Sequence, residues 1–383
     1  MRVYLDYNAT TPLDPAVERA MRPYQKGVYG NASSLHAEGR LARAAIESAR
    51  QTVASAMRVE SQDIIFTSGG TESDNLALLG AARRCDPKRR RVIVSAIEHP
   101  AVLESARYLK EEGYEIVIAP AGSGGVVEVG FIREHAGPST ALISLMHVNN
   151  ELGTLQPVEA VGEIARRCGA LFHVDAVQSF GKIPVLPGRM GADLLSVSSH
   201  KLCGPKGAGA LYVKKGTPLK PLFFGGHQER RLRPGTEAVS IIVGFGHAVR
   251  LASEKSINEV ERVGRLRNRL ERGLVERIDG IVVNGSGQTR IFNTLNVSFE
   301  RVDAEALMIR LDLEGLEVSS GSACTAGSLD PSHVLTAIGL PELLAASAVR
   351  YSLGRFTTAG DIATAIAATA SVVKKIRKSI RRR

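Results

Sequence analysis

The chain has 383 residues, of which 44% are hydrophobic and 23% are charged, and this ordinary balance excludes a wholly disordered protein. The formal net charge is +10, but seven positive charges lie in the last ten residues, 374–383, so the rest of the chain carries only +3. Neither this basic tail nor a second basic cluster at residues 83–91 contains an aromatic residue on which a base could stack. We therefore expect solvated surface at both places, and nucleic-acid binding is unlikely on this composition.

The cysteines at positions 85, 168, 203 and 324 form no C-x-x-C pair. Neither a zinc site nor a disulfide scaffold is indicated, and no metal site is expected. The first residues are too polar for a signal peptide, and no run approaches the roughly 18 apolar residues that would span a bilayer. The sequence predicts a soluble, cytoplasmic protein without a membrane partner.

The first long element is an amphipathic helix over residues 36–57, with Leu41, Ala45, Ala49, Val53 and Ala56 on its apolar stripe. Seven strand-like runs follow, at residues 64–66, 92–94, 116–118, 141–145, 171–174, 194–197 and 210–213. Several are continuously apolar, as expected for parallel strands buried on both faces. Helical segments such as 158–167 connect them. This alternation predicts an α/β domain, residues 15–255, with a mainly parallel sheet between helices.

The pattern changes after Gly235. Residues 240–277 predict a long helix, broken or bent near Ser256, and strands follow at 281–283 and 294–299 before a helix, a loop and a final helix. Residues 1–14 and 256–383 are therefore expected to form a smaller α+β domain. It would carry the Gly/Ser-rich segment at about 319–330 and the basic tail.

Three strand ends carry residues with chemical potential. Thr67–Asn75 forms a glycine turn in which Thr71 and the amides that follow would open a helix at Asn75, an arrangement suited to a phosphate. Asp175 ends a buried strand, where α/β sheets bind ligands, and its carboxylate could pair with a protonated heteroaromatic nitrogen. Lys201 follows another strand, where a desolvated amine can form a Schiff base. Each has an ordinary alternative: a simple turn, a helix N-cap or a surface lysine. Together they supply what pyridoxal 5'-phosphate requires.

The segment Ser319–Ser328 is too small and polar to pack a core, so we expect a mobile loop. A free cysteine is usually a small buried hydrophobe, an interpretation that suits Cys85 and Cys168 and extends to Cys203. It suits Cys324 poorly, because its neighbours are small and flexible. Cys324 is therefore a candidate nucleophile.

Ordered motifs along nearly the whole chain carry a family resemblance. They are Tyr4–Pro12, Gly30–His36, Thr67–Asn75, Glu98–Pro100, His147–Gly153, His173–Ser179, Ser199–Gly207, Arg233–Thr236, Ser320–Ser328 and Val349–Arg355. With these motifs the chain resembles cysteine desulfurases of the NifS/IscS kind, within the class V aminotransferase family of fold-type I pyridoxal-phosphate enzymes. The resemblance implies a large domain with a mainly parallel seven-stranded sheet, a small α+β domain and a homodimer.

The resemblance also implies a role for each matched residue. Lys201 would form the Schiff base with the cofactor, Cys324 would accept sulfur as a persulfide, and His99 would stack on the ring and transfer protons. The remaining roles are as follows: Asp175 on the ring nitrogen; Gln178 on the ring hydroxyl; Gly70, Thr71, Ser198 and His200 at the phosphate, joined by Thr236 of the second subunit; Asn150 against the cofactor and substrate; and Arg350 as a bidentate clamp on the substrate carboxylate.

The implied reaction converts L-cysteine to L-alanine and passes the sulfur to an iron–sulfur scaffold or another acceptor. A selenocysteine lyase or another class V aminotransferase is the alternative within enzymes, and a basic sulfur-carrier or nucleic-acid-associated protein is the alternative outside them. Leu202-Cys203 departs from the aromatic residue expected after the lysine. This departure predicts a second thiol beside the site.

Overall fold

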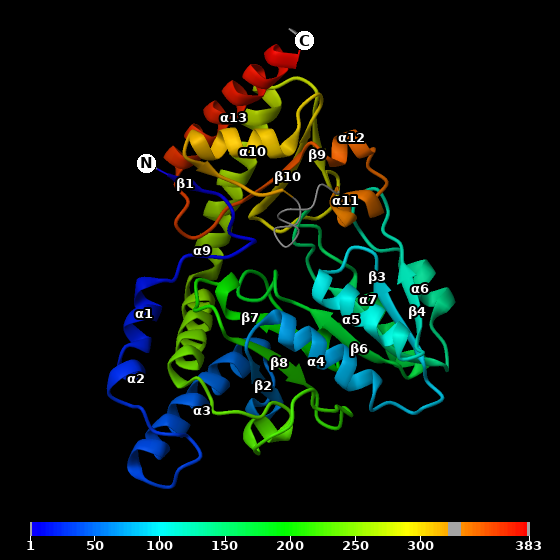
Figure 1. Ribbon diagram of the computed structural model, residues 1–383, viewed down its shortest axis with the longest axis vertical. Coiled ribbons are helices and arrows are strands. Elements are labelled where there is room, and N and C mark those ends of the chain that lie inside the picture. Colours follow the sequence, from blue (N-terminus) through cyan, green and yellow to red (C-terminus); the bar gives the residue numbers. More distant parts are fainter. Residues whose placement is uncertain (1, 321–330, 381–383) are drawn as a thin grey trace.

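A computed structural model describes residues 2–320 and 331–380 of the chain. The larger part is a sheet covered by helices, and a smaller part with its own sheet lies beside one end of it (Figure 1). Helix α9, Val239–Arg277, runs from the larger part into the smaller one. Among the described residues, no helix has the length and apolarity needed to cross a membrane.

All seven predicted strands form one sheet, in the order β2-β8-β7-β6-β5-β3-β4. Their bounds are β2 Ile64–Thr67, β3 Arg91–Ser95, β4 Glu115–Ala119, β5 Thr140–Met146, β6 Leu171–Asp175, β7 Leu194–Ser198 and β8 Gly209–Val213. Only β8 runs against its two neighbours, so the expected mainly parallel sheet is confirmed. The carboxyl ends of β3, β5, β6 and β7 consequently share one edge, where ligands of such sheets bind.

The two faces of this sheet pack against different helices, because successive strand residues point to opposite sides. Ile65, Val92 and Leu211 pack with α4 and α5, whereas Ile64, Ile93 and Phe172 pack with residues of α3, α6, α7 and α9. The helix bounds are α3 Ala37–Met57, α4 Gly70–Ala82, α5 Pro100–Glu111, α6 Val129–His135 and α7 Val158–Cys168. Shorter helices of this part are α1 Pro15–Met21, α2 Pro23–Lys26 and α8 Pro187–Met190, with 3-10 turns η1 Ser61–Asp63, η2 Ser199–Lys201 and η3 Gln228–Arg231.

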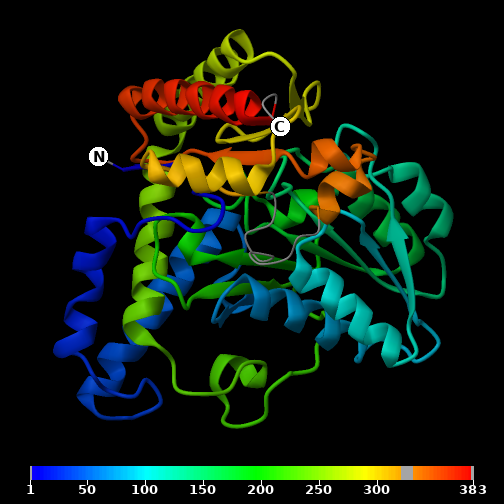
Figure 2. The same cartoon turned by 45° about the horizontal axis from the view of Figure 1, so that its top comes forward.

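The smaller part contains an antiparallel sheet in the order β12-β10-β9 and a short parallel pair, β1 with β11. Its elements are β1 Val3–Tyr4, β9 Ile281–Asn284, β10 Thr294–Phe299, α10 Ala304–Leu313, β11 Leu316–Glu317, α11 His333–Ala337, α12 Glu342–Ala345, β12 Ala348–Ser352 and α13 Ala359–Ile380. Figure 2 shows α10 and α13 lying together above the large sheet. A separate core joins residues 3 and 5 to residues between 263 and 376. The domain boundaries at residues 14/15 and 255/256 stay our proposal.

Three predictions about elements need correction. Leu41 is 53% exposed, because a row of residues four apart drifts about 40° per step around a helix; the buried row of α3 passes through Ala42, Ile46 and Val53. Helix α9 continues through Ser256 without a break. The final segment holds a strand, β12, that was predicted as loop or helix.

The predicted final helix is confirmed as far as residue 380, because residues 374–380 continue helix α13. Ile376 is buried in the smaller core, and Arg377 donates to the carbonyls of Asp279 and Glu300. Helix α13 is amphipathic, so the positive charges of the tail lie on its outer side while its other side packs against the core. Deleting the tail would therefore remove part of that core.

Candidate active site

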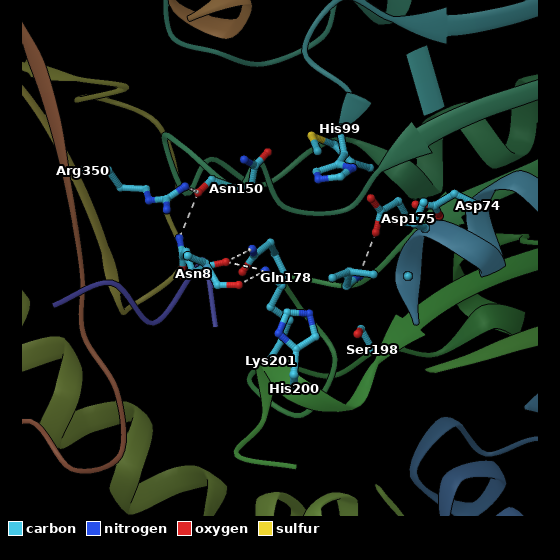
Figure 3. A pocket seen from close by; sticks show the side chains of 15 residues that line it. Asn8, Asp74, His99, Asn150, Asp175, Gln178, Ser198, His200, Lys201 and Arg350 are labelled. Atoms are coloured by element: carbon cyan, nitrogen blue, oxygen red, sulfur yellow. Dashed lines mark hydrogen bonds between the residues drawn. The ribbon is translucent and has the colours of Figure 1, made fainter. Parts of the chain in front are cut away.

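A cavity of about 230 Å³ lies at the carboxyl edge of the large sheet, between the two parts of the molecule. It is lined by Asn8, Ala9, Gly70, Thr71, Asp74, His99, Met146, Asn150, Asp175, Val177, Gln178, Ser198, His200, Lys201 and Arg350. Ten of the eleven predicted site residues among the described ones lie on this wall, and Thr236 is the exception. Figure 3 shows Arg350 and Asn150 on one side, Asp74 and Asp175 on the other, and Lys201 with Gln178 between them.

Lys201 ends the 3-10 turn η2, which follows β7 directly. Its Nζ donates to the carbonyl oxygens of Asn8 at 2.5 Å and Ala9 at 2.8 Å. These carbonyls belong to the loop after β1, which Thr11 fastens to the same turn by donating to the carbonyl of His200. The amine is thereby held over the cavity by the N-terminal segment.

Asp175 is the last residue of β6, and its carboxylate accepts a hydrogen bond from the backbone N–H of Val177 at 2.9 Å. No helix follows, so the N-cap alternative does not apply. Burial raises the pKa of Asp175 to about 6, opposed by that hydrogen bond and by the charge of Lys201. A cation placed against this carboxylate would bring its pKa down again.

Asp74 lies beside Asp175 and is fully buried in the first turns of α4. Burial raises its pKa well above the usual range, and the charge of Asp175 raises it further. Its Oδ1 lies 3.6 Å from Nε2 of His173, whose own pKa burial lowers to about 3. The neutral His173 bridges the hydroxyls of Ser144 and Ser196 beneath the cavity.

The part of the wall next to these carboxylates is suited to an anion. Helix α4 begins at Gly70, five residues before the predicted start at Asn75, and Gly69 is its N-cap. Its N-terminal amides reach the cavity beside Thr71. The Ser198 hydroxyl is buried and has no hydrogen-bond partner among the described residues. A Cβ on Gly70 would approach Cγ2 of Val177 to 2.8 Å, so the wall has no room for a side chain there.

His200 completes this wall and interacts through Nδ1 with the hydroxyl of Thr10 at 3.1 Å. Burial lowers its pKa to about 4, and the charges of Lys201, Lys206 and Lys182 contribute. His200 is therefore neutral at pH 7, and it would contribute a hydrogen bond to an anion and not a charge.

His99 is the N-cap of α5, and its Nδ1 accepts the backbone N–H of Ala101 at 3.1 Å. This contact assigns the ring proton of the neutral form to Nε2. Burial lowers the pKa of His99 to about 4, and the charges of Lys201 and His333 lower it further. A neutral imidazole with a known tautomer thus borders the cavity.

Arg350 lies in the middle of β12 and is almost fully buried. Its Nη2 donates to Oδ1 of Asp6 at 2.8 Å and its Nη1 to the carbonyl of Asn150 at 3.2 Å. The carbonyl of Asn150 also accepts from Nδ2 of Asn8. The guanidinium is thus oriented at the cavity by fixed partners, the arrangement needed to bind a carboxylate.

Two predicted residues do not line this cavity, and a third is not among the described residues. Thr236 is exposed and does not line the cavity within one chain. Cys324 lies outside the described residues. Cys203 is buried, does not line the cavity, and has a thiol pKa that burial raises, so the prediction of a second thiol beside the site is wrong. Its backbone has a φ of +60°, and its N–H donates to the hydroxyl of Thr11 at 2.9 Å.

Sequence reasoning missed Asn8 and Asp74 as parts of the wall. Both stand inside motifs that carried the resemblance, but no pattern signalled them individually. Asn8 acts largely through its backbone carbonyl, which accepts from Lys201 and from Nε2 of Gln178 at 3.0 Å. Asp74 resembles any acidic residue near a helix N-terminus.

The chain is similar to known proteins along nearly its whole length. A model of the aminotransferase class-V family matches residues 3–364. "Cysteine desulfurase IscS" of Dictyoglomus turgidum is 45% identical over 375 residues, 98% of this chain and 95% of that protein. A solved "NifS-like protein" superposes with a TM-score of 0.92 at 36% identity, over 98% of this chain and 100% of that one.

A second solved structure, "SspA in complex with cysteine", has a TM-score of 0.83 at 37% identity, over 93% of this chain and 100% of that one. The predicted resemblance to NifS/IscS-like enzymes and the predicted fold class are confirmed by these matches. The chain belongs to the class-V aminotransferase family.

Proposed function

We propose that this protein is a cysteine desulfurase that uses pyridoxal 5'-phosphate to convert L-cysteine to L-alanine and transfers the sulfur through Cys324. The observation that carries the proposal is one cavity bordered by an amine, Lys201, a buried carboxylate, Asp175, and an oriented guanidinium, Arg350. The relatives named as cysteine desulfurases support it. No observation favours a selenocysteine lyase or another aminotransferase.

The residues present fit the cofactor. Ser198 offers a buried hydroxyl without a partner among the described residues, beside the first amides of α4, so this end suits a phosphate. Asp175 offers a carboxylate whose raised pKa a cationic ring nitrogen would lower. Gly70, Thr71, Ser198 and His200 would hold the phosphate, Gln178 the ring hydroxyl, and Lys201 the aldehyde.

The bound cofactor would supply an electron sink for the negative charge that develops when a proton leaves the substrate's α-carbon. Asp175 would keep that sink effective, because its carboxylate favours a protonated ring nitrogen. Lys201 Nζ, when free, would take the α-proton of the bound substrate. The carbonyls of Asn8 and Ala9, which accept from Nζ, would keep the amine near the reacting carbon.

Arg350 and Asn150 would bind the substrate carboxylate. The contacts of Arg350 with Asp6 and with the Asn150 carbonyl restrict the guanidinium before substrate arrives, which reduces the entropy lost on binding. Substrate would then lie between Arg350 and Lys201 on the side of the cavity away from Asp175 (Figure 3).

His99 and Cys324 would carry out the sulfur step. His99 is neutral at pH 7 and could move a proton through Nε2. The Cys324 thiolate would bond to the substrate sulfur while the carbon–sulfur bond breaks; the carbon would keep the electron pair and take a proton, leaving alanine and a persulfide. Only the thiolate is nucleophilic enough for this attack.

We also propose a homodimer to which Thr236 contributes across the interface. The support is that Thr236 is exposed in a single chain and that Phe223 and Phe224, earlier in the same segment, are 55% and 82% exposed. An iron–sulfur scaffold as sulfur acceptor and a cytoplasmic location stay predictions from the sequence.

The experiment compares Lys201→Ala with Lys215→Ala, an exposed lysine outside the cavity. The purified Lys215→Ala protein is expected to carry bound cofactor and to release alanine and sulfide from L-cysteine in the presence of a thiol reductant. Lys201→Ala should release neither. Equal turnover by the two variants, or a purified wild-type protein that neither contains nor binds the cofactor, would refute the proposal.

A further inference from the structure

Lys182 joins the active-site cavity to a second cavity behind it. The second cavity, of about 550 Å³, lies between the segment after β6 and helix α9, and its wall is mostly apolar, with Phe180, Ile183 and Val249 among its residues. Lys182 also lines this second cavity, yet its Nζ donates to Oε1 of Gln178 at 3.1 Å, and Gln178 lines the active site. The lysine thus reaches the active-site wall from behind.

The side-chain amide of Gln178 has two hydrogen-bond partners, one a donor and the other an acceptor. A lysine amine at Oε1 is a donor, whereas the carbonyl of Asn8 at Nε2, 3.0 Å away, can only accept. Only one orientation of the amide satisfies both. In that orientation its NH₂ group faces the N-terminal loop and the active-site cavity, and one of its two N–H bonds is used by Asn8.

Burying a lysine at position 182 costs free energy, and its contact with Gln178 helps to explain why a lysine is present there. Burial lowers the pKa of its ammonium to about 7, and the charges of Lys201 and Arg350 lower it further. An apolar side chain of similar length would avoid that cost in the apolar cavity. A lysine in this place therefore points to a role other than packing.

We propose that Lys182 is a positioning residue: by donating to Gln178 Oε1, it keeps the amide N–H of Gln178 directed at the cavity, where it would donate to the cofactor's ring oxygen. This inference rests on the proposed function, because that function places the ring oxygen near Gln178. It assigns to Lys182 no contact with substrate or cofactor.

Removing the amine leaves the amide with one of its two partners. In Lys182→Met, Oε1 of Gln178 loses its donor and only the Asn8 carbonyl still holds the amide, so the N–H is directed less firmly at the ring oxygen. A donated hydrogen bond stabilises the ionised form of that oxygen. We expect the pH midpoint of the visible absorbance of the bound cofactor to rise by at least about half a unit, and the affinity of apoprotein for the cofactor to fall about tenfold.

The experiment is a double-mutant cycle on purified holoenzyme, with Lys182→Met, Gln178→Ala and the pair, read by absorbance against pH and by cofactor titration of the apoproteins. If Lys182 acts through Gln178, its substitution changes neither readout in the Gln178→Ala background. Lys182→Arg, which keeps a donor, should restore the wild-type midpoint, and Lys110→Met, an exposed lysine on α5, should leave it unchanged.

Two results would overturn the inference: a Lys182→Met midpoint and affinity equal to wild type, or the same shift with and without Gln178, which indicates a simple charge effect. If Lys182→Met does not fold, Lys182→Ala, which also removes the donor to Gln178, supplies the same cycle. A wild-type protein without cofactor absorbance would instead refute the proposed function, so the two failures are distinguishable.

Discussion

Asp175→Asn should have opposite effects on stability and on activity. The substitution keeps the shape of the side chain and the oxygen that accepts from Val177 N–H, but it removes the buried charge. In the apoprotein that charge has no cofactor cation beside it, and burial raises its pKa from 3.8 to about 6. The native state is therefore destabilised by ionisation of Asp175.

The magnitude follows from this shift. Two pKa units at about 1.4 kcal/mol each correspond to about 3 kcal/mol of unfolding free energy at pH 8. Because the folded pKa is the higher one, the penalty is absent well below pH 4 and grows as the pH rises through 6. At pH 5 it should be about half its value at pH 8.

Urea unfolding of the wild-type and Asp175→Asn apoproteins at pH 5 and pH 8 measures this penalty in the free energy of unfolding. Asp175→Asn should be more stable than wild type by about 3 kcal/mol at pH 8, with the gain halved at pH 5, whereas the exposed Asp312→Asn should show no such trend. The Asp175→Asn holoenzyme should turn over L-cysteine about 10- to 100-fold more slowly than wild type, since a charge-assisted hydrogen bond is lost. An Asp175→Asn apoprotein no more stable than wild type at pH 8 would refute the reasoning.

Three further predictions concern other residues. Arg350→Lys should raise KM for L-cysteine at least about tenfold, because the bidentate fork is lost; an unchanged KM in steady-state kinetics would contradict that role. His99→Gln should lower kcat about 100-fold. Because the pKa of His99 is near 4, the wild-type rate should not change with titration of His99 between pH 6 and 8. A pH dependence of the wild-type rate in that range that is absent from His99→Gln would contradict the neutral imidazole. Arg50→Met should cost about 3–5 kcal/mol in urea unfolding, because both oxygens of the buried Glu229 carboxylate accept from Arg50 at 2.7 Å; a loss below 1 kcal/mol would contradict an unpaired buried charge.

The large sheet could be predicted from the sequence because most of its strands are buried on both faces and appear as uninterrupted apolar runs, although the edge strand β4 is partly exposed. Strand β12 could not, since Arg350 interrupts its short apolar pattern. The structure shows why an arginine is tolerated there: it is buried against the Asp6 carboxylate and a backbone carbonyl. A pairing between residues 344 positions apart leaves no local signal.

The candidate site was predicted through side chains whose chemistry is recognisable, such as Lys201 and Asp175. Asn8 and Lys182 were missed because each acts through a partner: the first through its carbonyl, the second through Gln178. The position of Cys203 depended on backbone geometry that a residue type does not reveal.

The most direct test of the central claim is the mass of the cysteine-containing peptides after the holoenzyme has reacted with L-cysteine without reductant. The proposed mechanism predicts one added sulfur atom on the peptide with Cys324, none on the peptide with Cys203, and alanine formed in equal amount. Alanine formed without sulfur on Cys324, or with sulfur on Cys203 instead, would contradict it.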